Sequence, residues 1–297
     1  QLNNPVEQLI LLVYSWQDVS ISLERMREIH HEPNEEGSMQ KKSSFPSAIE
    51  GKHYLSIDNL SFKYDKYSSK NILSNINLTI PYNKVTAIVG ASGSGKTTLI
   101  KLLLGFYEPT YGTISIDNTN MNEYSRSWWR SQCGSVMQES YLFSDTIARN
   151  IAVSEDEPDI NRIRQAARIA NIAEYIEALP LAYNTKIGKN GQTISLGQRQ
   201  RILIARVVYK NPLFIFLDEA TNALDAHNER IITKNLSEFY KGKTVIVAAH
   251  RLSTVRNADQ IIVLENGKVV EIGTHQQLIT SHGTYYNLIK NQLELSN

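Results

Sequence analysis

The stretch that decides the fold is a glycine-rich loop with the sequence Gly90-Ala91-Ser92-Gly93-Ser94-Gly95-Lys96-Thr97. It follows the apolar, β-branched run 85–89 and precedes the helix-like run 98–104, so we predict that it connects a strand to a helix. Glycines let consecutive backbone N–H groups turn toward phosphate oxygens, and the N-terminus of the following helix adds positive partial charge. In this spacing we expect Lys96 to reach the β- and γ-phosphates of a nucleotide and the Thr97 hydroxyl to bind Mg²⁺. The flanking strand and helix favour a P-loop over an ordinary Gly/Ser turn.

The composition is typical of a folded domain without a general attraction for polyanions. The 297 residues are 41% hydrophobic, which is enough to fill a core. With 31 Lys and Arg against 30 Asp and Glu, the formal net charge is +1, so we expect no nucleic-acid partner. The one cysteine, Cys133, cannot form an intrachain disulfide, which is typical of a reducing compartment, and we interpret it as a small buried hydrophobic residue. No apolar run approaches the roughly 20 residues that span a bilayer, and no signal peptide is recognisable.

The first part of the chain is predicted to be one long helix followed by a linker. Apolar residues recur at helical spacing from Pro5 to Ile29. The first half of this run is apolar almost all round and the second half is charged, as expected for a chain that leaves an apolar environment for water. An amphipathic helix packed on its own domain is the alternative. Prolines, glycine, serines and mixed charges then indicate a linker, so we divide the chain into a helix at 1–30, a linker at 31–52 and a domain at 53–297.

Beyond residue 53 the pattern predicts an α/β core that carries a helical subdomain. Apolar runs predict strands at 54–57, 60–64, 72–80, 85–89, 113–116, 213–217 and 244–248, and a hairpin of 261–264 with 269–272 around Asn266-Gly267. Helical patterns occupy 98–104, 145–151, 158–170, 173–178 and 196–209.

The apolar strand at 213–217 ends in two carboxylates, Asp218 and Glu219. In open α/β sheets, ligands lie beyond the carboxyl ends of the strands. We expect Asp218 to hold Mg²⁺ through water, and Glu219 to orient and deprotonate the water that attacks the γ-phosphate. The P-loop upstream favours this interpretation over a surface acidic pair at a strand end.

Three further side chains are candidates for the same site. His250 follows the strand at 244–248, where an imidazole can contact the γ-phosphate or position the attacking water. Gln138 can supply a neutral carbonyl oxygen to Mg²⁺. Tyr64 is a candidate for stacking on a base, although a tyrosine in a strand can also serve only for packing.

A second anion site is predicted where Ile194-Ser195-Leu196-Gly197-Gln198 begins the helix at 196–209. Ser195 and Gly197 at a helix N-terminus are suited to bind phosphate. If the two phosphate sites of one chain cannot close on a single nucleotide, two chains must close on it together. That geometry is an isologous dimer.

Taken in order, these residues make 54–293 resemble the nucleotide-binding domain of an ATP-binding-cassette (ABC) transporter. The resemblance is carried by an aromatic A-loop at Tyr64, the P-loop, a Q-loop at Gln138, a signature around Ser195, a Walker B motif at Asp218-Glu219, a D-loop at Asn222-Ala223-Leu224-Asp225, and His250. It implies a P-loop NTPase core of the ABC ATPase type, with an antiparallel β subdomain and a helical signature subdomain. It also implies that ATP and Mg²⁺ bind, and that two copies form a head-to-tail dimer in which each signature caps the ATP on the partner's P-loop.

The resemblance further implies a role in transport. ATP closure and hydrolysis in this family move attached membrane domains, and the helix at 1–30 resembles the end of a last transmembrane helix of an exporter. The domain would then lie at the cytoplasmic face of a membrane, here a bacterial inner membrane. The stretches Trp128-Trp129-Arg130, 141–145 and 291–295 are similar to peptide and bacteriocin exporters that carry an N-terminal cysteine-peptidase domain, which makes a peptide the expected substrate. A lipid or drug exporter, a soluble ABC-type ATPase and a non-hydrolysing ATP switch are the alternatives.

Motifs and resemblance together predict the following site. The catalytic residues are Lys96, Glu219 and His250; the nucleotide-binding residues are Tyr64, Gly90, Ala91, Ser92, Gly93, Ser94, Gly95, Lys96, Thr97, Thr98, Gln138, Ser195, Gly197, Gln198 and Asp225; the metal ligands are Thr97, Gln138 and Asp218.

Two positions depart from the family pattern. The usual signature is Leu-Ser-Gly-Gly-Gln, but here Ile194 and Leu196 replace its first and third residues. A side chain at 196 is expected to hinder close approach of the backbone to phosphate and so to weaken ATP closure. Exporters also tend to have Gly-Glu-x-Gly shortly before the signature, where this chain has Lys189 in place of the glutamate, which is expected to change coupling to the membrane domains.

Overall fold

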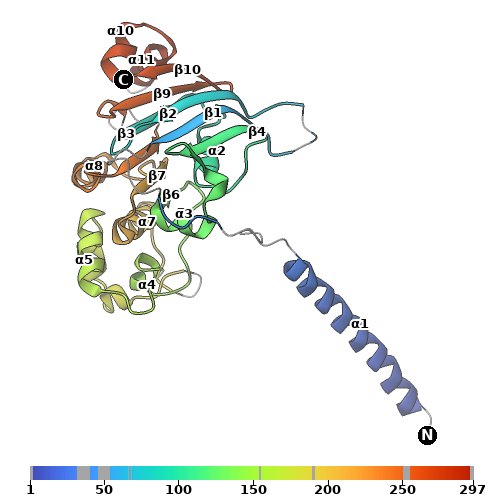
Figure 1. The fold of residues 1–297 in the computed structure, drawn as a ribbon. Helices are drawn as coiled ribbons and strands as arrows, with labels where there is room; N and C mark the ends of the chain where they lie inside the picture. The colour runs from blue at the N-terminus through green and yellow to red at the C-terminus, as the bar shows by residue number, and fades with distance from the viewer. Residues whose placement is uncertain are drawn as a thin grey trace. The chain divides into compact units, whose positions relative to one another are not determined.

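The computed structural model describes residues 3–31, 41–45, 54–65, 67, 69–153, 155–188, 191–249 and 255–294. The chain divides into two compact units, Gln1–Lys41 and Lys42–Asn297 (Figure 1). The second unit therefore begins upstream of the domain start that we predicted at residue 53. Lys189 and His250, both singled out above, lie outside the described residues.

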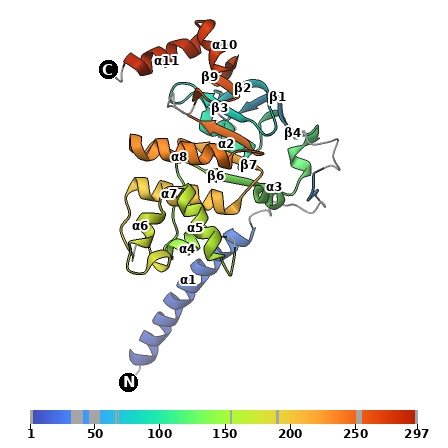
Figure 2. The same cartoon turned by 90° about the vertical axis from the view of Figure 1, so that its left-hand side faces the viewer.

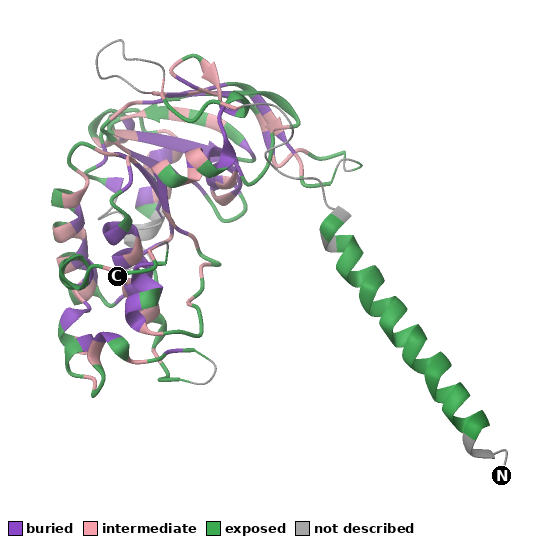
Figure 3. Cartoon of the chain, turned by 60° about the horizontal axis from the view of Figure 1, so that its bottom comes forward, coloured by how far each residue is buried: buried purple, intermediate pink, exposed green. Residues whose placement is uncertain are grey.

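The first unit holds the helix α1 (Asn3–His31), which the apolar periodicity predicted at 5–29. Its described side chains are exposed on every face, including Leu12 and Trp16 (Figure 3). Among the described residues, none of the helices combines the length and the hydropathy needed to cross a lipid bilayer.

The second unit is built on a six-stranded sheet with the strand order β10-β9-β3-β8-β7-β6. Its strands are β3 (Val85–Val89), β6 (Cys133–Val136), β7 (Phe214–Asp218), β8 (Thr244–Ala248), β9 (Gln260–Glu265) and β10 (Lys268–Gly273). Strands β3, β6, β7, β8 and β9 pair in parallel, and β10 forms one edge of the sheet as an antiparallel hairpin with β9. Because the carboxyl ends of parallel strands meet at one edge, the loop after β3 and the carboxylates that end β7 lie on the same side of the sheet.

A second sheet of four antiparallel strands has the order β2-β1-β4-β5. Its strands are β1 (Leu55–Phe62), β2 (Leu73–Ile80), β4 (Tyr111–Ile116) and β5 (Thr119–Asn120). The structure corrects one prediction here, because the two strands expected at 54–57 and 60–64 are a single strand, β1. Its register with β2 shifts between Ile57 and Leu60, where Asn59 adopts a left-handed φ of 51°, and this irregularity interrupts the alternation along the strand. The strand ends at Phe62, so Tyr64 lies beyond it.

The helices of the second unit lie in several places: α4 to α7 lie together, away from the antiparallel sheet, whereas α10 and α11 lie at the opposite end of the unit (Figure 2). They are α2 (Lys96–Leu103), η1 (Met121–Glu123), α3 (Arg126–Gln132), α4 (Ile147–Ile151), α5 (Ile160–Ile169), α6 (Ala173–Glu177), η2 (Ala182–Asn184), α7 (Leu196–Lys210), α8 (Ala226–Phe239), α10 (His275–Thr280) and α11 (Thr284–Glu294). The five helices predicted from sequence are confirmed as α2, α4, α5, α6 and α7. Helices α3, α8, α10 and α11 and strand β6 were not predicted.

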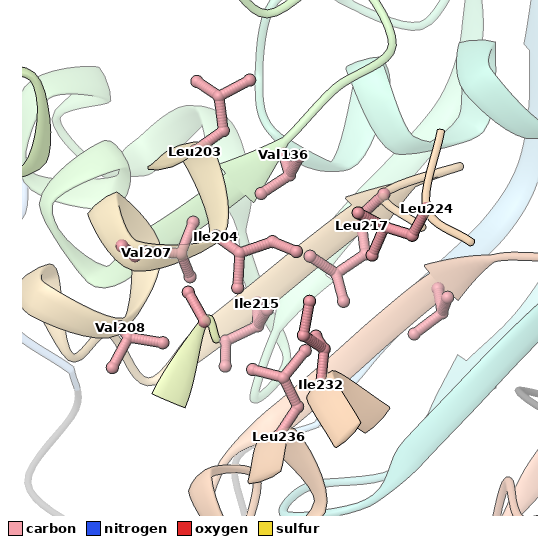
Figure 4. Packing of buried hydrophobic residues seen from close by; sticks show 14 of the residues in the cluster. Val136, Leu203, Ile204, Val207, Val208, Ile215, Leu217, Leu224, Ile232 and Leu236 are labelled. Carbon is pink, nitrogen blue, oxygen red and sulfur yellow. The ribbon is translucent and has the colours of Figure 1, made fainter. Parts of the chain in front are cut away.

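Strand β7 of the large sheet is buried on both faces. On one face, Ile215 and Leu217 of β7 join the core of the helical side, whereas Phe214 and Phe216 join the core formed with α2 and the antiparallel sheet. Figure 4 shows Ile204 of α7 beside Ile215, with the apolar side chains of α8 next to them. Helix α7 is thereby packed directly against the strand that delivers the two carboxylates.

The segment just before the antiparallel sheet is attached to the second unit. Lys42 N–H donates to the carbonyl oxygen of Glu123 at 2.8 Å, and Ser125 N–H donates to the carbonyl oxygen of Lys42 at 2.9 Å. The ring of Phe45 meets that of Trp128 edge-to-face, with centroids 4.8 Å apart. These contacts explain why the second unit begins at Lys42.

Candidate nucleotide-binding site

The glycine-rich loop between β3 and α2 has the backbone geometry that its composition predicts. Gly95, which precedes the first residue of α2, adopts a left-handed φ of 104° that an L side chain rarely tolerates. At Gly90, an added Cβ would lie 2.2 Å from the carbonyl oxygen of Leu264, so any side chain there would collide with main chain. No side chain of the described residues caps the N-terminus of α2. Its first N–H groups therefore have no side-chain partner there, and the loop needs glycine at these two positions.

The side chain of Lys96 is hydrogen-bonded to the glycine-rich loop that precedes it. It is 6% exposed, and its Nζ donates to the carbonyl oxygens of Gly90 and Ala91, both at 2.9 Å. Burial lowers the pKa of Lys96, and the negative charges of Glu219 and Asp218 oppose this shift. The ammonium group is thus positioned for phosphate, and loop carbonyls solvate its charge when phosphate is absent.

Asp218 is a buried carboxylate that lacks hydrogen-bond partners. It is 1% exposed, and neither of its oxygens accepts a hydrogen bond from the described residues. Burial raises the pKa of Asp218, and the nearby Thr97 hydroxyl counteracts that rise. An unpartnered buried carboxylate beside a hydroxyl matches the oxygen ligands that Mg²⁺ prefers, so these two residues fit a bound divalent cation.

Glu219 follows Asp218 in an unusual backbone conformation. Its φ is 54°, in the left-handed region that non-glycine residues rarely occupy. Its N–H donates to the carbonyl oxygen of Ala248 at 3.2 Å, which ties it to the end of β8, and its Oε2 accepts a hydrogen bond of 2.7 Å from the side chain of Asn222. The backbone turn and the Asn222 contact fix both the direction and the end of this side chain.

The other predicted residues of the same edge lie close to these groups. Gln138, exposed just after β6, lines a groove of about 270 Å³ together with Glu219 and Leu196. Tyr64, which is half-exposed, lies with its hydroxyl 3.2 Å from Thr98 Oγ1 on α2. Its ring is therefore accessible next to the P-loop helix, as a base-stacking residue requires.

The signature turn at the start of α7 is arranged differently from the P-loop. Ser195 caps α7: its Oγ accepts from Gln198 N–H at 3.2 Å, and Gln198 Oε1 accepts from Ser195 N–H at 2.8 Å. Gly197 lies against the D-loop, where an added Cβ would be 3.1 Å from the carbonyl oxygen of Ala223. Leu196 projects outward and is 67% exposed. Within the described residues, no hydrogen bond connects this turn to the P-loop.

Asp225 has a structural role in addition to its predicted place in the D-loop. It caps α8, and its Oδ1 accepts from the N–H groups of His227 and Asn228 at 3.1 and 2.9 Å. The hydrogen bonds from the Asn228 backbone and side chain lower the pKa of this carboxyl.

Sequence reasoning missed Gln200, and it named Asn222 only as part of the D-loop without a contact to Glu219. The side chain of Gln200, on α7, bridges Glu219 and Ala223, and Asn222 contacts the carboxylate of Glu219. A polar residue in the second turn of a helix and an amide in a loop have no distinctive local pattern, so only the folded arrangement could identify them.

Comparison with known proteins agrees with this geometry. The sequence model described as ABC transporter matches residues 73–222, which include the P-loop, the signature turn and the two carboxylates. The chain belongs to the ABC transporter family. It carries the ATP-binding domain of that family, an ATPase, and the predicted fold and ATP binding are confirmed.

Relatives of this ABC transporter chain include exporters. It is 42% identical over 296 residues to the "Leukotoxin translocation ATP-binding protein LktB" of Mannheimia haemolytica, and equally similar to the proteins of that name from Mannheimia glucosida and Bibersteinia trehalosi. These matches cover all of the chain but only 41% of each relative. A solved structure described as a bacterial Atm1-family ABC exporter with ATP bound superimposes with a TM-score of 0.83 and 34% identity, over 98% of this chain and 50% of that one. The chain therefore spans half or less of the proteins that it matches.

Proposed function

We propose that this chain couples ATP hydrolysis to the export of a polypeptide across a membrane, as one half of a head-to-tail dimer of two identical ATP-binding domains. The observation that supports the proposal is that the N-termini of α2 and α7, the two helix ends predicted to bind phosphate, share no hydrogen bond within the described residues of one chain. A nucleotide held at α2 can meet an α7 end only if a second copy supplies it. Two copies related by a two-fold axis would enclose two nucleotides, each between one P-loop and the partner's signature turn.

Each residue of the site has a defined part in this proposal. Lys96 donates to the β- and γ-phosphates, Tyr64 stacks on the base, and the partner's Ser195 caps the γ-phosphate. Glu219 accepts a proton from the attacking water as the bond between the γ-phosphorus and the bridging oxygen breaks, and ADP and inorganic phosphate leave. His250, outside the described residues, stays a prediction as a ligand of the γ-phosphate.

We infer that the site also takes Mg²⁺. Thr97 would bind it through its hydroxyl, and Asp218 through water. Gln138 would contribute its side-chain carbonyl. The bare carboxylate of Asp218 supports this assignment, because a buried charge without partners is otherwise costly. When bound, Mg²⁺ neutralises charge on the phosphates.

The transported substrate and the location are inferred from the relatives. The LktB proteins are named for the translocation of a leukotoxin, which supports a polypeptide substrate for this chain. The similarity of the Atm1-family exporter supports membrane domains as partners and the cytoplasmic face of a bacterial inner membrane as the location. A peptide or bacteriocin, as the sequence resemblance implied, is the form of polypeptide that we propose.

The test uses the Glu219→Gln variant, because an amide cannot accept the proton of the attacking water. We expect hydrolysis to fall by about 10²- to 10⁴-fold while ATP binding remains. Light scattering after size-exclusion chromatography, with and without Mg²⁺ and ATP, should then show a dimer only with nucleotide. The double variant Lys96→Ala/Glu219→Gln, which lacks the main phosphate contact, is the matched control and should stay monomeric. A monomer that holds ATP in calorimetry would contradict the head-to-tail dimer, and near-normal phosphate release would remove Glu219 from the role of base.

A further inference from the structure

The side chain of Gln200 connects the helix α7 to both ends of the turn that carries Glu219. Its Nε2 donates to the carbonyl oxygen of Glu219 at 3.0 Å, and its Oε1 accepts from the N–H of Ala223 at 3.0 Å. One half-buried amide therefore satisfies a carbonyl and an N–H that lie four residues apart on the turn after β7. No other side-chain type of similar length offers a donor and an acceptor in this arrangement.

The Glu219 backbone needs such support. A left-handed φ of 54° is unfavourable for a non-glycine residue, so it persists only where surrounding contacts determine it. Contacts from three elements help to hold Glu219: the carbonyl oxygen of Ala248 at the end of β8 accepts from its N–H, its carbonyl oxygen accepts from Gln200 of α7 and from Asn222 N–H, and its carboxylate accepts from the Asn222 side chain. Gln200 is the contact that comes from the signature helix.

The first turn of α7 belongs to the same connected group. Ser195 and Gly197 lie about one turn before Gln200 along the helix, and Gly197 is packed against the carbonyl of Ala223, whose N–H Gln200 holds. A displacement of the α7 end is thus passed to Glu219 through a single side chain and a tightly packed turn. The groove lined by Gln138, Leu196, Gln200 and Glu219 places all four groups on one surface.

We propose that Gln200 is a positioning residue for hydrolysis: it orients Glu219 and links it to the signature turn of the same chain. The proposal rests on the proposed dimer, in which the α7 end of one chain contacts the ATP on its partner's P-loop while Glu219 acts on the ATP of its own P-loop. Gln200 then connects the two ATP sites within one chain, so that capping of one nucleotide orients the base that acts on the other.

The test compares two substitutions with a matched control. Gln200→Met keeps the length and removes both hydrogen bonds, whereas Gln200→Glu keeps the acceptor for Ala223 N–H and loses the donor to Glu219. The control is Gln165→Met, at an exposed position of α5 away from the site. Steady-state ATP hydrolysis by the 297-residue chain, normalised to bound nucleotide, gives kcat, KM and the Hill coefficient for ATP.

For both Gln200 variants we expect kcat to fall roughly 10- to 100-fold with KM for ATP within about threefold of wild type, because misplacing a catalytic group slows chemistry without touching the P-loop contacts. Any Hill coefficient above 1 in the wild type should fall toward 1. Gln165→Met should match the wild type. A normal kcat per bound ATP in either Gln200 variant overturns the proposal. A variant that loses thermal stability but keeps its kcat overturns it in the same way. If Gln200→Met does not fold, Gln200→Glu still provides the test.

This outcome is separable from that of the proposed dimer. Light scattering of Glu219→Gln tests the dimer without reference to Gln200. A loss of kcat in the Gln200 variants together with a nucleotide-dependent Glu219→Gln dimer supports both proposals. If the Gln200 variants lose kcat but the Glu219→Gln chain binds ATP as a monomer, the orienting role of Gln200 is supported. The proposed dimer is then overturned, and with it the link between two ATP sites.

Discussion

The two helix ends that we assign to ATP phosphates, those of α2 and α7, are built in opposite ways. Helix α2 begins at a left-handed Gly95 with no side-chain cap among the described residues, and the neighbouring Lys96 is buried against loop carbonyls. Helix α7 begins at Ser195 with a complete capping box, in which Ser195 and Gln198 satisfy each other. The N-terminal donors of α2 have no side-chain partner among the described residues, whereas the N–H groups of Ser195 and Gln198 at the start of α7 are already bonded within the capping box.

The difference implies that the two helix ends bind phosphate under different conditions. Phosphate can bind at α2 without breaking any side-chain cap, so this end is suited to hold the nucleotide on a single chain. Phosphate at α7 must compete with the Ser195 and Gln198 contacts, so the second end adds affinity only when a nucleotide is already presented to it by another chain. If α2 binds the nucleotide tightly and α7 contacts it only when another chain presents it, the dimer would close only when ATP is bound.

The largest effect should come from Lys96→Ala, which removes the charged donor of the α2 end. A hydrogen bond to a charged group contributes about 1.5–3 kcal/mol, so we expect ATP affinity to fall roughly 10- to 100-fold in calorimetry. Lys84→Ala is the control, because Lys84 makes an exposed ion pair with Asp259 outside the site and should leave affinity unchanged. Equal ATP affinity of Lys96→Ala and wild type would show that the α2 end does not hold the nucleotide through this lysine.

A smaller effect is expected from Ser195→Ala, which removes the cap of α7. The lost cap should lower the free energy of unfolding by about 1 kcal/mol, and ATP binding to the single chain should not change. The ATP-dependent dimer of Glu219→Gln should weaken, since the variant lacks the hydroxyl that we propose to contact the partner's nucleotide.

The control for this variant is a second capping box in the same chain. Thr274 and Gln277 cap α10 in the same reciprocal manner, away from the site. Thr274→Ala should lower stability by a similar amount in chemical denaturation and leave the dimer intact. If the two variants weaken the dimer equally, the α7 cap has no special contact with ATP.

The fold was predictable wherever a local pattern matched the final burial. The apolar run that ends at Asp218 is buried on both faces of the sheet, and the P-loop glycines have the backbone geometry that their spacing required. Strand β6 was missed because four residues with a glycine carry almost no periodicity, although Gly134 is needed there: an added Cβ would lie 2.7 Å from Pro212. Helix α8 was missed because its cap, Asp225, was read only as part of the D-loop.

The details of the site were less predictable, because they depend on contacts between distant segments. The identities of Lys96, Asp218 and Glu219 followed from motif spacing. The left-handed Glu219 and its bridge to Gln200 did not, since they arise when the turn after β7 packs against α7. The register shift in β1 likewise depends on pairing with β2, and β1 ends at Phe62, before Tyr64, which was predicted to lie in the strand.

The smallest effect should come from Leu196→Gly, which makes the α7 end more like the α2 end. Leu196 is 67% exposed at the first position of α7, so its removal costs little packing, and a glycine lets the backbone approach phosphate more closely. We expect the ATP-dependent dimer of the Glu219→Gln chain to tighten a few-fold, about 1 kcal/mol, in sedimentation at varied concentration. Leu181→Gly, at a leucine that is 65% exposed outside the site, controls for the loss of an exposed apolar side chain and should leave the dimer unchanged. An unchanged dimer in Leu196→Gly would mean that the leucine does not obstruct the nucleotide. Phosphate binding at the N-terminus of α7 would then be limited by the capping box alone.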